Sequence, residues 1–218
     1  MLAYNRIVDH PTSSAGQAAL LAELLRGRRS VRRYVDREVP RQAIRSVLES
    51  ARWAPSPHNS QPWRFAVLRS AGARERLANA LGERWRADLA ADGMPAAQID
   101  KLIGRSRERI GGAPVTLIIS LTWADLDTYP DDKRQQAEYL MAAHSLGAAA
   151  QNIMLTAHAH GLASCWMCAP LFCPGVVREA LELPAEVVPQ ALITLGYGAL
   201  EPPVRERRPL EELVLLDT

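Results

Sequence analysis

The sequence predicts an α+β sandwich built around a single apolar core, and three observations support this class. Expected helices and strands follow one another without the regular alternation of a doubly wound α/β fold. No Gly-x-Gly-x-x-Gly turn follows an expected strand and no Gly-Lys-Ser/Thr loop occurs, which disfavours a dinucleotide-binding Rossmann fold. The chain has 218 residues, 48% of them hydrophobic, which is enough for one sizeable core but not for two. We therefore expect one domain over residues 1–218.

Composition and charge exclude several classes of protein. The net charge is only +2, whereas a nucleic-acid-binding surface would need a larger excess of basic residues. No run of about 18 apolar residues occurs, so no transmembrane helix is expected. The three cysteines, Cys165, Cys168 and Cys173, are odd in number and clustered, unlike a secreted disulfide framework. We expect a cytoplasmic protein with neither a membrane nor a nucleic acid as partner.

The first part of the chain predicts an arm, two helices and a strand. Residues 1–17 are polar and irregular and are expected to form an N-terminal arm. Leucines over 20–25 predict a short amphipathic helix that ends near Gly27. Pro40 suits the first turn of a second helix, and residues 63–68 predict a strand. The apolar residues of the second helix share one face: Ile44, Val47, Leu48 and Ala51.

The middle of the chain predicts two polar helices followed by a buried strand. The helices are expected over 73–91 and 95–110, separated by an Asp-Gly pair. Residues 114–121 are almost continuously apolar, which suits a central strand covered on both faces. We expect most of the tryptophans to be core residues: Trp53, Trp63, Trp85, Trp123 and Trp166.

A long helix is expected over 132–160. Asp132 and Gln135 can form a capping box at its start, and Gly161 can end it. His144 within it is expected to be a core histidine. Its small side chains would let neighbouring elements approach closely: Ala142, Ala143, Ala148, Ala149 and Ala150. We therefore expect this helix to be central, against the core or a second subunit.

The last part of the chain predicts two strands around a short helix, and then an arm. The strands are expected over 162–167 and 190–196, with the helix over 174–183. Residues 200–218 are rich in proline and end in the apolar stretch 213–216. Such a stretch must bury its side chains somewhere, so we expect an extended C-terminal arm.

Four residues near the first helix end form a candidate phosphate site: Arg28, Arg29, Ser30 and Arg32. Guanidinium groups make strong, charge-assisted hydrogen bonds to phosphate, and the hydroxyl adds another donor. The alternatives are a solvated basic face or a nucleic-acid contact.

A rigid polar loop follows the second helix. Residues 54–62 place polar side chains between prolines, so that amides and hydroxyls can contact the polar edge of a flat ring. The residues that would do so are Ser56, Pro57, His58 and Asn59. The alternative is an ordinary connection from helix to strand.

Together, "RRSVRRY" and "APSPHNSQPWRF" resemble the opening of the nitroreductase superfamily. The resemblance extends from about Leu20 to the end, and it implies an α-β-α sandwich with a mixed, mostly antiparallel central sheet. It also implies an FMN cofactor held between the two subunits of a homodimer, with each active site using both chains and the arm 200–218 crossing to the partner. Within the superfamily, "RADLAADG", "GAPVTLIISLT", "SCWM" and "RRPLEEL" resemble the C-terminal FMN reductase domain of the bifunctional ligase/reductase of coenzyme F-420 biosynthesis. This chain lacks the ligase half.

The resemblance assigns roles to individual positions. The arginine-serine cluster would bind the FMN phosphate and ribityl side, and residues 56–59 the isoalloxazine ring. Met167 and Cys168 match the segment whose backbone passes flavin N5. Arg205 and Arg207 match a basic pair that reaches the phosphate, although a solvated tail is the alternative. Asp88 falls where the related domain contacts its deazaflavin substrate, and the alternative for it is a solvated helical carboxylate.

The motif Cys165-Trp166-Met167-Cys168 leaves three interpretations. A redox dithiol would be expected at the start of a helix near the N-terminus, not late in the chain. A zinc site would need further ligands, such as His158 or His160, and their spacing fits no familiar zinc pattern. We favour cysteines packed near the flavin and expect no metal.

The implied activity is hydride transfer from a reduced nicotinamide or a reduced deazaflavin, through flavin N5, to an unsaturated, nitro or quinone-like acceptor. The acceptor could be a dehydro precursor in F-420 biosynthesis, or the enzyme could be a broad nitro or quinone reductase. Two further interpretations are an oxygen-using, flavin-fragmenting dimethylbenzimidazole synthase and a non-catalytic flavin-binding protein. No side-chain nucleophile is needed for the reductase chemistry.

Overall fold

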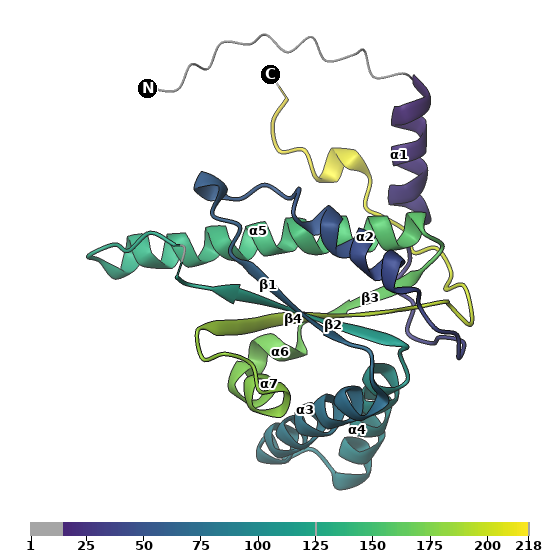
Figure 1. Ribbon diagram of the computed structural model, residues 1–218, viewed down its shortest axis with the longest axis vertical. Helices are drawn as coiled ribbons and strands as arrows, with labels where there is room; N and C mark the ends of the chain where they lie inside the picture. Colours follow the sequence, from purple (N-terminus) through teal and green to yellow (C-terminus); the bar gives the residue numbers. More distant parts are fainter. Residues whose placement is uncertain (1–14, 125, 218) are drawn as a thin grey trace.

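A four-stranded sheet in the order β1-β2-β4-β3 forms the centre of the molecule (Figure 1). The computed structural model describes residues 15–124 and 126–217. The strands are β1 (Trp63–Leu68), β2 (Val115–Thr122), β3 (Ala163–Met167) and β4 (Val187–Gly196). All three strand pairs are antiparallel, and a parallel pairing occurs only at an isolated bridge between Ser30 and Ser164 within the described residues. β2 is buried along its whole length, as its apolar sequence predicts.

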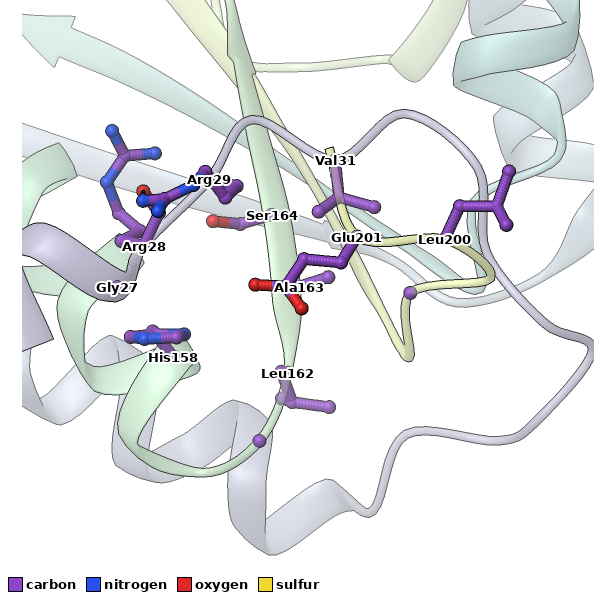
Figure 2. Close-up of a pocket in the computed structure, with 12 residues that line it drawn as sticks. Gly27, Arg28, Arg29, Val31, His158, Leu162, Ala163, Ser164, Leu200 and Glu201 are labelled. Carbon is purple, nitrogen blue, oxygen red and sulfur yellow. Dashed lines mark hydrogen bonds between the residues drawn. The ribbon is translucent and has the colours of Figure 1, made fainter. Parts of the chain in front are cut away.

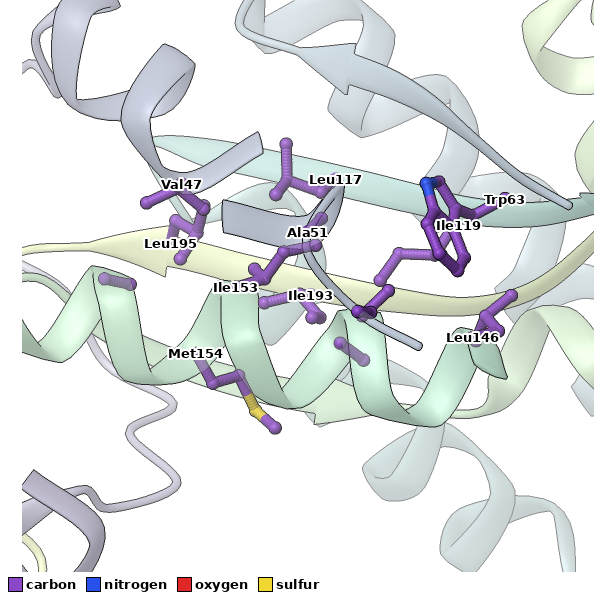
Figure 3. Packing of buried hydrophobic residues seen from close by; sticks show 14 of the residues in the cluster. Val47, Ala51, Trp63, Leu117, Ile119, Leu146, Ile153, Met154, Ile193 and Leu195 are labelled. Carbon is purple, nitrogen blue, oxygen red and sulfur yellow. The ribbon is translucent and has the colours of Figure 1, made fainter. Parts of the chain in front are cut away.

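Two helices cover one face of the sheet, α2 (Arg41–Ala51) and α5 (Asp132–Ala159). Alternate residues of β2 and β4 point to this side and form the main core with both helices (Figure 3). Its members include Val47, Ala51, Leu117, Ile119, Ala149, Ile153, Ile193 and Leu195. The alanine-rich helix is thus packed directly on the sheet, as predicted.

The opposite face carries a second layer of helices: α3 (Ala71–Ala91), α4 (Ala96–Gly111), α6 (Ala169–Phe172) and α7 (Pro174–Leu181). Ile118 and Leu192 point to this side and pack against Leu77, Leu81 and Val177. The outer ends of α3 and α4 form a smaller cluster of their own: Leu89, Ile99 and Ile103. The result is the helix-sheet-helix sandwich that the sequence predicts.

The long helix α5 is capped differently from the prediction. Its N-cap is Asp131, whose carboxylate accepts a hydrogen bond from the Arg134 N–H at 3.0 Å. Asp132 lies inside the first turn, and the Gln135 side chain accepts from the Tyr129 N–H instead. Gly161, with a φ of 71°, follows the helix as predicted, because the left-handed region suits glycine.

Three further expectations need correction. The helix α1 (Ala15–Gly27) begins before the predicted end of the arm, so residues 15–17 are helical, while residues 1–14 lie outside the described part. Trp53 is 80% exposed and Trp85 39% exposed, so neither is a core residue; Trp63 is buried. His144 is exposed on α5, because the core-facing positions of that helix are taken by its alanines.

Much apolar surface remains exposed along the tail and on two helices. The stretch 213–216 is largely uncovered, with Leu215 97% exposed. Leucines of α1 and the segment Tyr139, Leu140 and Met141 of α5 are also exposed. Among the described helices, none has the length and hydropathy needed to cross a bilayer.

Candidate functional site

The basic segment after α1 lies along the outer edge of β3. The Val31 N–H donates to the Ser164 carbonyl at 3.0 Å. The Tyr34 hydroxyl donates to the Val31 carbonyl at 2.8 Å and lies 2.7 Å from the Thr194 hydroxyl. These contacts link the segment to β3 and β4, so the arginine cluster has a fixed position at one edge of the sheet.

A cavity of about 320 Å³, here called the phosphate cavity, opens beside this segment (Figure 2). Arg28 and Arg29 line it from the segment, Ser164 from β3, and His158 from the end of α5. The Arg29 guanidinium donates to the carbonyls of Arg26 and Arg28, yet its buried Nε has no hydrogen-bond partner. A buried, unpartnered guanidinium N–H is costly unless an anion accepts from it.

These residues fit a phosphate group, with one exception. Two guanidinium groups and a hydroxyl offer charge-assisted hydrogen bonds to a doubly charged monoester. The carboxylate of Glu201 lies in the same cavity (Figure 2) and would repel an anion. Glu201 is exposed and follows β4 in the tail, so phosphate binding requires its side chain to turn towards solvent.

Of the four predicted phosphate residues, two therefore line the cavity. Ser30 and Arg32 are exposed beside it, and an Arg32 Nη donates to the Ser30 carbonyl at 3.3 Å. Arg205 and Arg207 are exposed in the tail and do not line the cavity.

A second cavity, of about 510 Å³, lies on the other side of β3 between α3, α4 and α6; we call it the α3–α4 cavity. Met167, at the end of β3, forms part of its wall, and Asp88 lines it from α3. The Asp88 side chain is 45% exposed and forms an ion pair with Arg84 at 2.8 Å on the same helix, so the alternative of a solvated helical carboxylate also remains. The structure thus brings together two residues that the resemblance assigned, one to the flavin and one to the substrate.

The strand β3 contributes to both cavities. Ser164 lines the phosphate cavity, and Met167, three residues later, lines the α3–α4 cavity. Between them the Cys165 thiol is buried, and burial raises its pKa, while the charges of Arg32, Arg109 and Arg28 act in the opposite direction. The two cavities therefore border the same short strand.

The polar loop lies far from this edge within the same chain. The loop leads into Trp63 of β1, which lies level with Val188 of β4 through the pairing of both strands with β2. Ser164, which lines the phosphate cavity, pairs with Leu195 of β4. Val188 and Leu195 are seven residues apart, or about 24 Å along the strand direction, and the three strand spacings from β1 to β3 add about 14 Å across the sheet. The His58 ring lies 3.4 Å from Asp127 at that distant end. One chain therefore does not bring residues 56–59 to the phosphate cavity.

The loop itself is held in an unusual conformation. His58, Asn59 and Gln61 have positive φ values of 51°, 56° and 47°. The Ser56 hydroxyl accepts from the Gln61 N–H at 3.0 Å and so closes the turn. Three non-glycine residues in the left-handed region within four positions mark a strained loop, and such strain is concentrated at functional sites.

The two cysteines of the Cys-x-x-Cys motif differ in exposure. Cys165 is buried and Cys168 exposed, and all three cysteines are free thiols. No group of three His, Cys, Asp or Glu side chains within the described residues is arranged to hold a metal ion.

Several residues of the α3–α4 cavity were not predicted from the sequence: Arg84, Trp85, Arg105, Ser106 and Arg109. Their spacing in the sequence does place them on common helix faces, because residues three or four apart lie side by side. One face belongs to α3, with residues 81, 84, 85 and 88, and the other to α4, with residues 102, 105, 106 and 109. The pattern mixes apolar and charged residues, so hydrophobic periodicity alone did not reveal it.

The chain is similar to known proteins in sequence and in fold. The family model described as the nitroreductase family matches residues 25–197. A 4-nitrobenzoate reductase from Nocardioides sp. (strain LMS-CY) is 30% identical over 216 residues, covering 88% of this chain and 85% of that protein.

Two solved structures share the fold and 29% sequence identity. One is a Desulfovibrio desulfuricans protein assigned to the nitroreductases and solved in complex with FMN; its TM-score is 0.70, with 91% of this chain and 96% of that chain covered. The other is the FMN-dependent nitroreductase NfnB from Mycobacterium smegmatis in complex with NADPH; its TM-score is 0.69, with coverages of 92% and 99%.

Proposed function

The chain belongs to the nitroreductase family, and from this premise we propose that it is an FMN-dependent oxidoreductase. It takes electrons from a reduced nicotinamide and passes them to a small conjugated acceptor, of the nitro or quinone kind. The similar structures in complex with FMN and with NADPH support both the cofactor and the donor.

The observation that carries the proposal is the phosphate cavity with its unpartnered Arg29 Nε. FMN ends in a single phosphate monoester, and this site offers donors for one phosphate and no glycine-rich turn for a pyrophosphate. Along β3, Ser164 at this cavity is followed by Met167 and then Cys168, where the resemblance puts the reactive edge of the ring.

Bound FMN supplies the hydride chemistry, and the protein binds, orients and shields it. Arg28 and Arg29 would hold its phosphate. The positive charges of Arg32 and Arg109, which oppose the rise in the pKa of Cys165 caused by burial, would favour an electron-rich cofactor near β3. Met167 and Asp88 line the adjoining space in which donor and acceptor bind in turn.

We also propose that each site is completed by a second copy of the chain. Residues 56–59 are too far from their own phosphate cavity, yet they form a strained loop suited to contacting a ring. The exposed stretch 213–216 and the uncovered leucines of α1 supply apolar surface for such an interface. In the dimer, Arg205 and Arg207 would approach a phosphate and residues 56–59 a flavin ring.

A second candidate acceptor is a dehydro precursor of the deazaflavin F-420. It is favoured by Asp88, which lines the α3–α4 cavity beside Met167, at the position where the related domain contacts its deazaflavin substrate. This candidate also allows a reduced deazaflavin as donor. The three free thiols suit the cytoplasm that the sequence predicts.

The proposal is tested by identifying the extracted cofactor and measuring oxidation of NADH and NADPH with a nitroarene, a quinone or a dehydro deazaflavin precursor. We expect FMN, not FAD, and nicotinamide oxidation that depends on an acceptor. Flavin binding without turnover of any acceptor would favour a non-catalytic flavin-binding protein. Formation of dimethylbenzimidazole from FMN under oxygen would favour a flavin-fragmenting synthase.

A further inference from the structure

We propose that the α3–α4 cavity selects acceptors that carry an acid group, and that Arg105 and Arg109 bind that group. The proposal rests on the oxidoreductase function above and adds the substrate class: a flat conjugated molecule with a carboxylate or a similar anion. Two observations support it: the excess of arginine over aspartate among the residues that line the cavity, and the apolar and aromatic side chains that form the rest of its wall.

The charges of the cavity do not cancel. Three guanidinium groups but only one carboxylate group line the cavity. That carboxylate, Asp88, is already paired with Arg84 at 2.8 Å. Neither Arg105 nor Arg109 forms an ion pair or a side-chain hydrogen bond with another described residue. Two exposed arginines therefore line the cavity, and neither has a charged partner in the described part of the chain.

The two free guanidinium groups are placed to act together. Arg105 and Arg109 are four residues apart on α4, so they lie one above the other on the same helix face. The Ser106 hydroxyl lies on that face as well. Planar guanidinium groups bind a carboxylate in bidentate fashion, which fixes the direction of the ligand as well as its charge.

The rest of the wall is apolar and aromatic. Leu81, Trp85 and Leu102 come from the two helices, and Met167 and Phe172 from the strand end and α6. A cavity of about 510 Å³ with this lining suits a ring system of one or two rings. Its acid group would meet the arginines while its ring lies against Met167, towards the proposed flavin position.

The two arginines lie one helical turn apart on α4. Arg109 is near the C-terminal end of the helix, and its charge opposes the rise in the pKa of Cys165 that burial causes in β3, so it could serve the cofactor in addition to the acceptor. Arg105 lies one turn closer to the start of the helix. The acid-group assignment consequently depends most on Arg105.

The test compares two acceptors of nearly equal shape, 4-nitrobenzoate and the neutral 4-nitrobenzamide. We expect the wild-type enzyme to prefer the benzoate in kcat/KM, and Arg105→Gln to reduce that preference by about tenfold or more. Turnover of the benzamide should change little. Titration of the oxidised holoenzyme with benzoate and benzamide gives a second readout, in which only benzoate affinity should fall.

The control is Arg76→Gln, an exposed arginine of α3 that does not line the cavity. It should leave the preference unchanged. Arg109→Gln is compared with Arg105→Gln by its flavin reduction potential, because an effect through the cofactor would move the potential and slow both acceptors equally.

Three results would overturn the inference while leaving the oxidoreductase function standing. The first is a wild-type enzyme that turns over both acceptors without preference. The second is an Arg105→Gln variant that loses both acceptors equally. The third is a variant whose only defect is a raised KM for NADPH relative to NADH, which would assign the charge to the 2′-phosphate of the donor. Absence of turnover with either acceptor and any donor would instead refute the proposed function itself.

Discussion

Single side chains around β3 decide whether an anion can bind there. Arg29 is held by backbone carbonyls of its own segment and keeps one buried N–H free. Arg28 lines the same cavity. The positive charge of the cavity is thus pre-organised, and the loss of one guanidinium should weaken phosphate binding rather than folding.

Arg28→Ala should lower FMN affinity by about tenfold to hundredfold, because a hydrogen bond to a charged group contributes about 1.5–3 kcal/mol. Titration of the apoprotein, followed by flavin fluorescence, measures this. Arg33→Ala is the matched control, since Arg33 is exposed and does not line the cavity. Equal affinities in both variants would contradict the phosphate site.

The two cysteines of the Cys-x-x-Cys motif should behave as unrelated thiols. Burial raises the pKa of Cys165, so it stays protonated at a pH where an ordinary thiol begins to ionise. Cys168 is exposed. Native protein at a pH of about 8 should therefore react rapidly with a thiol reagent at Cys168 and slowly at Cys165.

The double variant Cys165→Ser with Cys168→Ser should retain most of its flavin-dependent turnover. Mass spectrometry of the labelled peptides and a turnover assay provide the two measurements. A folded, FMN-loaded double variant without activity would restore the dithiol hypothesis.

At this scale the sequence indicated some of the residues that line cavities. Arg28 and Arg29 line the phosphate cavity and Asp88 lines the α3–α4 cavity, while the roles assigned to them stay predictions. Arg105 and Arg109 were missed, since a charged pair on a helix usually belongs to a solvated face; both residues are exposed here, and only the packing of α3 against α4 creates the cavity that they line. That packing depends on contacts between residues distant in sequence.

Among the elements, α5 contributes most to the fold. It has 28 residues, or about 42 Å, and its small side chains allow close approach to the sheet. Ala149 and Ala150 are completely buried there. The helix both fills the main core and, at its end, presents His158 to the phosphate cavity.

Ala149→Leu should destabilise the protein by about 1–3 kcal/mol, because the extra carbons of leucine cannot be placed in a packed core without shifting the sheet or the helix. Urea unfolding monitored by circular dichroism measures this. Ala137 on the same helix is exposed, so Ala137→Leu should change the unfolding free energy by less than about 0.5 kcal/mol. A tolerated leucine at 149 would mean that the helix is less closely packed than the structure shows.

The elements were largely predictable from sequence, and their ends less so. An apolar face marked α2, capping residues and a high alanine content marked α5, and a continuous apolar run marked β2. The cap of α5 was placed one residue late, because Asp131 and Asp132 are both good caps and the sequence does not distinguish them. The four-residue helix α6 was missed, since so short an element has no periodic signal.

For the molecule as a whole, the main feature is the separation of two groups of proposed flavin-binding residues. The arginine segment lies at the β3 edge, and the strained loop leads into β1 at the other edge and the other end. The sequence predicted both motifs but not this separation, which depends on strand order. It is the reason for expecting that two chains build each site.

Mixed dimers offer a direct test of shared sites. One chain carries Arg28→Ala with Arg29→Ala, and the other carries Ser56→Ala with Asn59→Ala. If each site takes one motif from each chain, a heterodimer purified through two different tags has one intact site out of two. FMN content and turnover should then recover to about half of the wild-type value.

Neither parent homodimer should bind FMN tightly. If the motifs acted within one chain, every site in the heterodimer would carry a defect, and no recovery would be seen. A monomer that retains FMN at nanomolar concentration would also exclude shared sites.

The strand order also determines when the flavin site can exist during synthesis. β3 precedes β4 in the chain, yet β4 is the strand that pairs with it. On the ribosome, β3 must therefore wait as an unpaired edge, a state that invites association with other chains. Gly198, Leu200 and Glu201, which help to close the phosphate cavity, emerge later still. FMN can therefore bind only after nearly the whole chain has been synthesised. Until β4 pairs with it, β3 is a segment that a chaperone would need to protect.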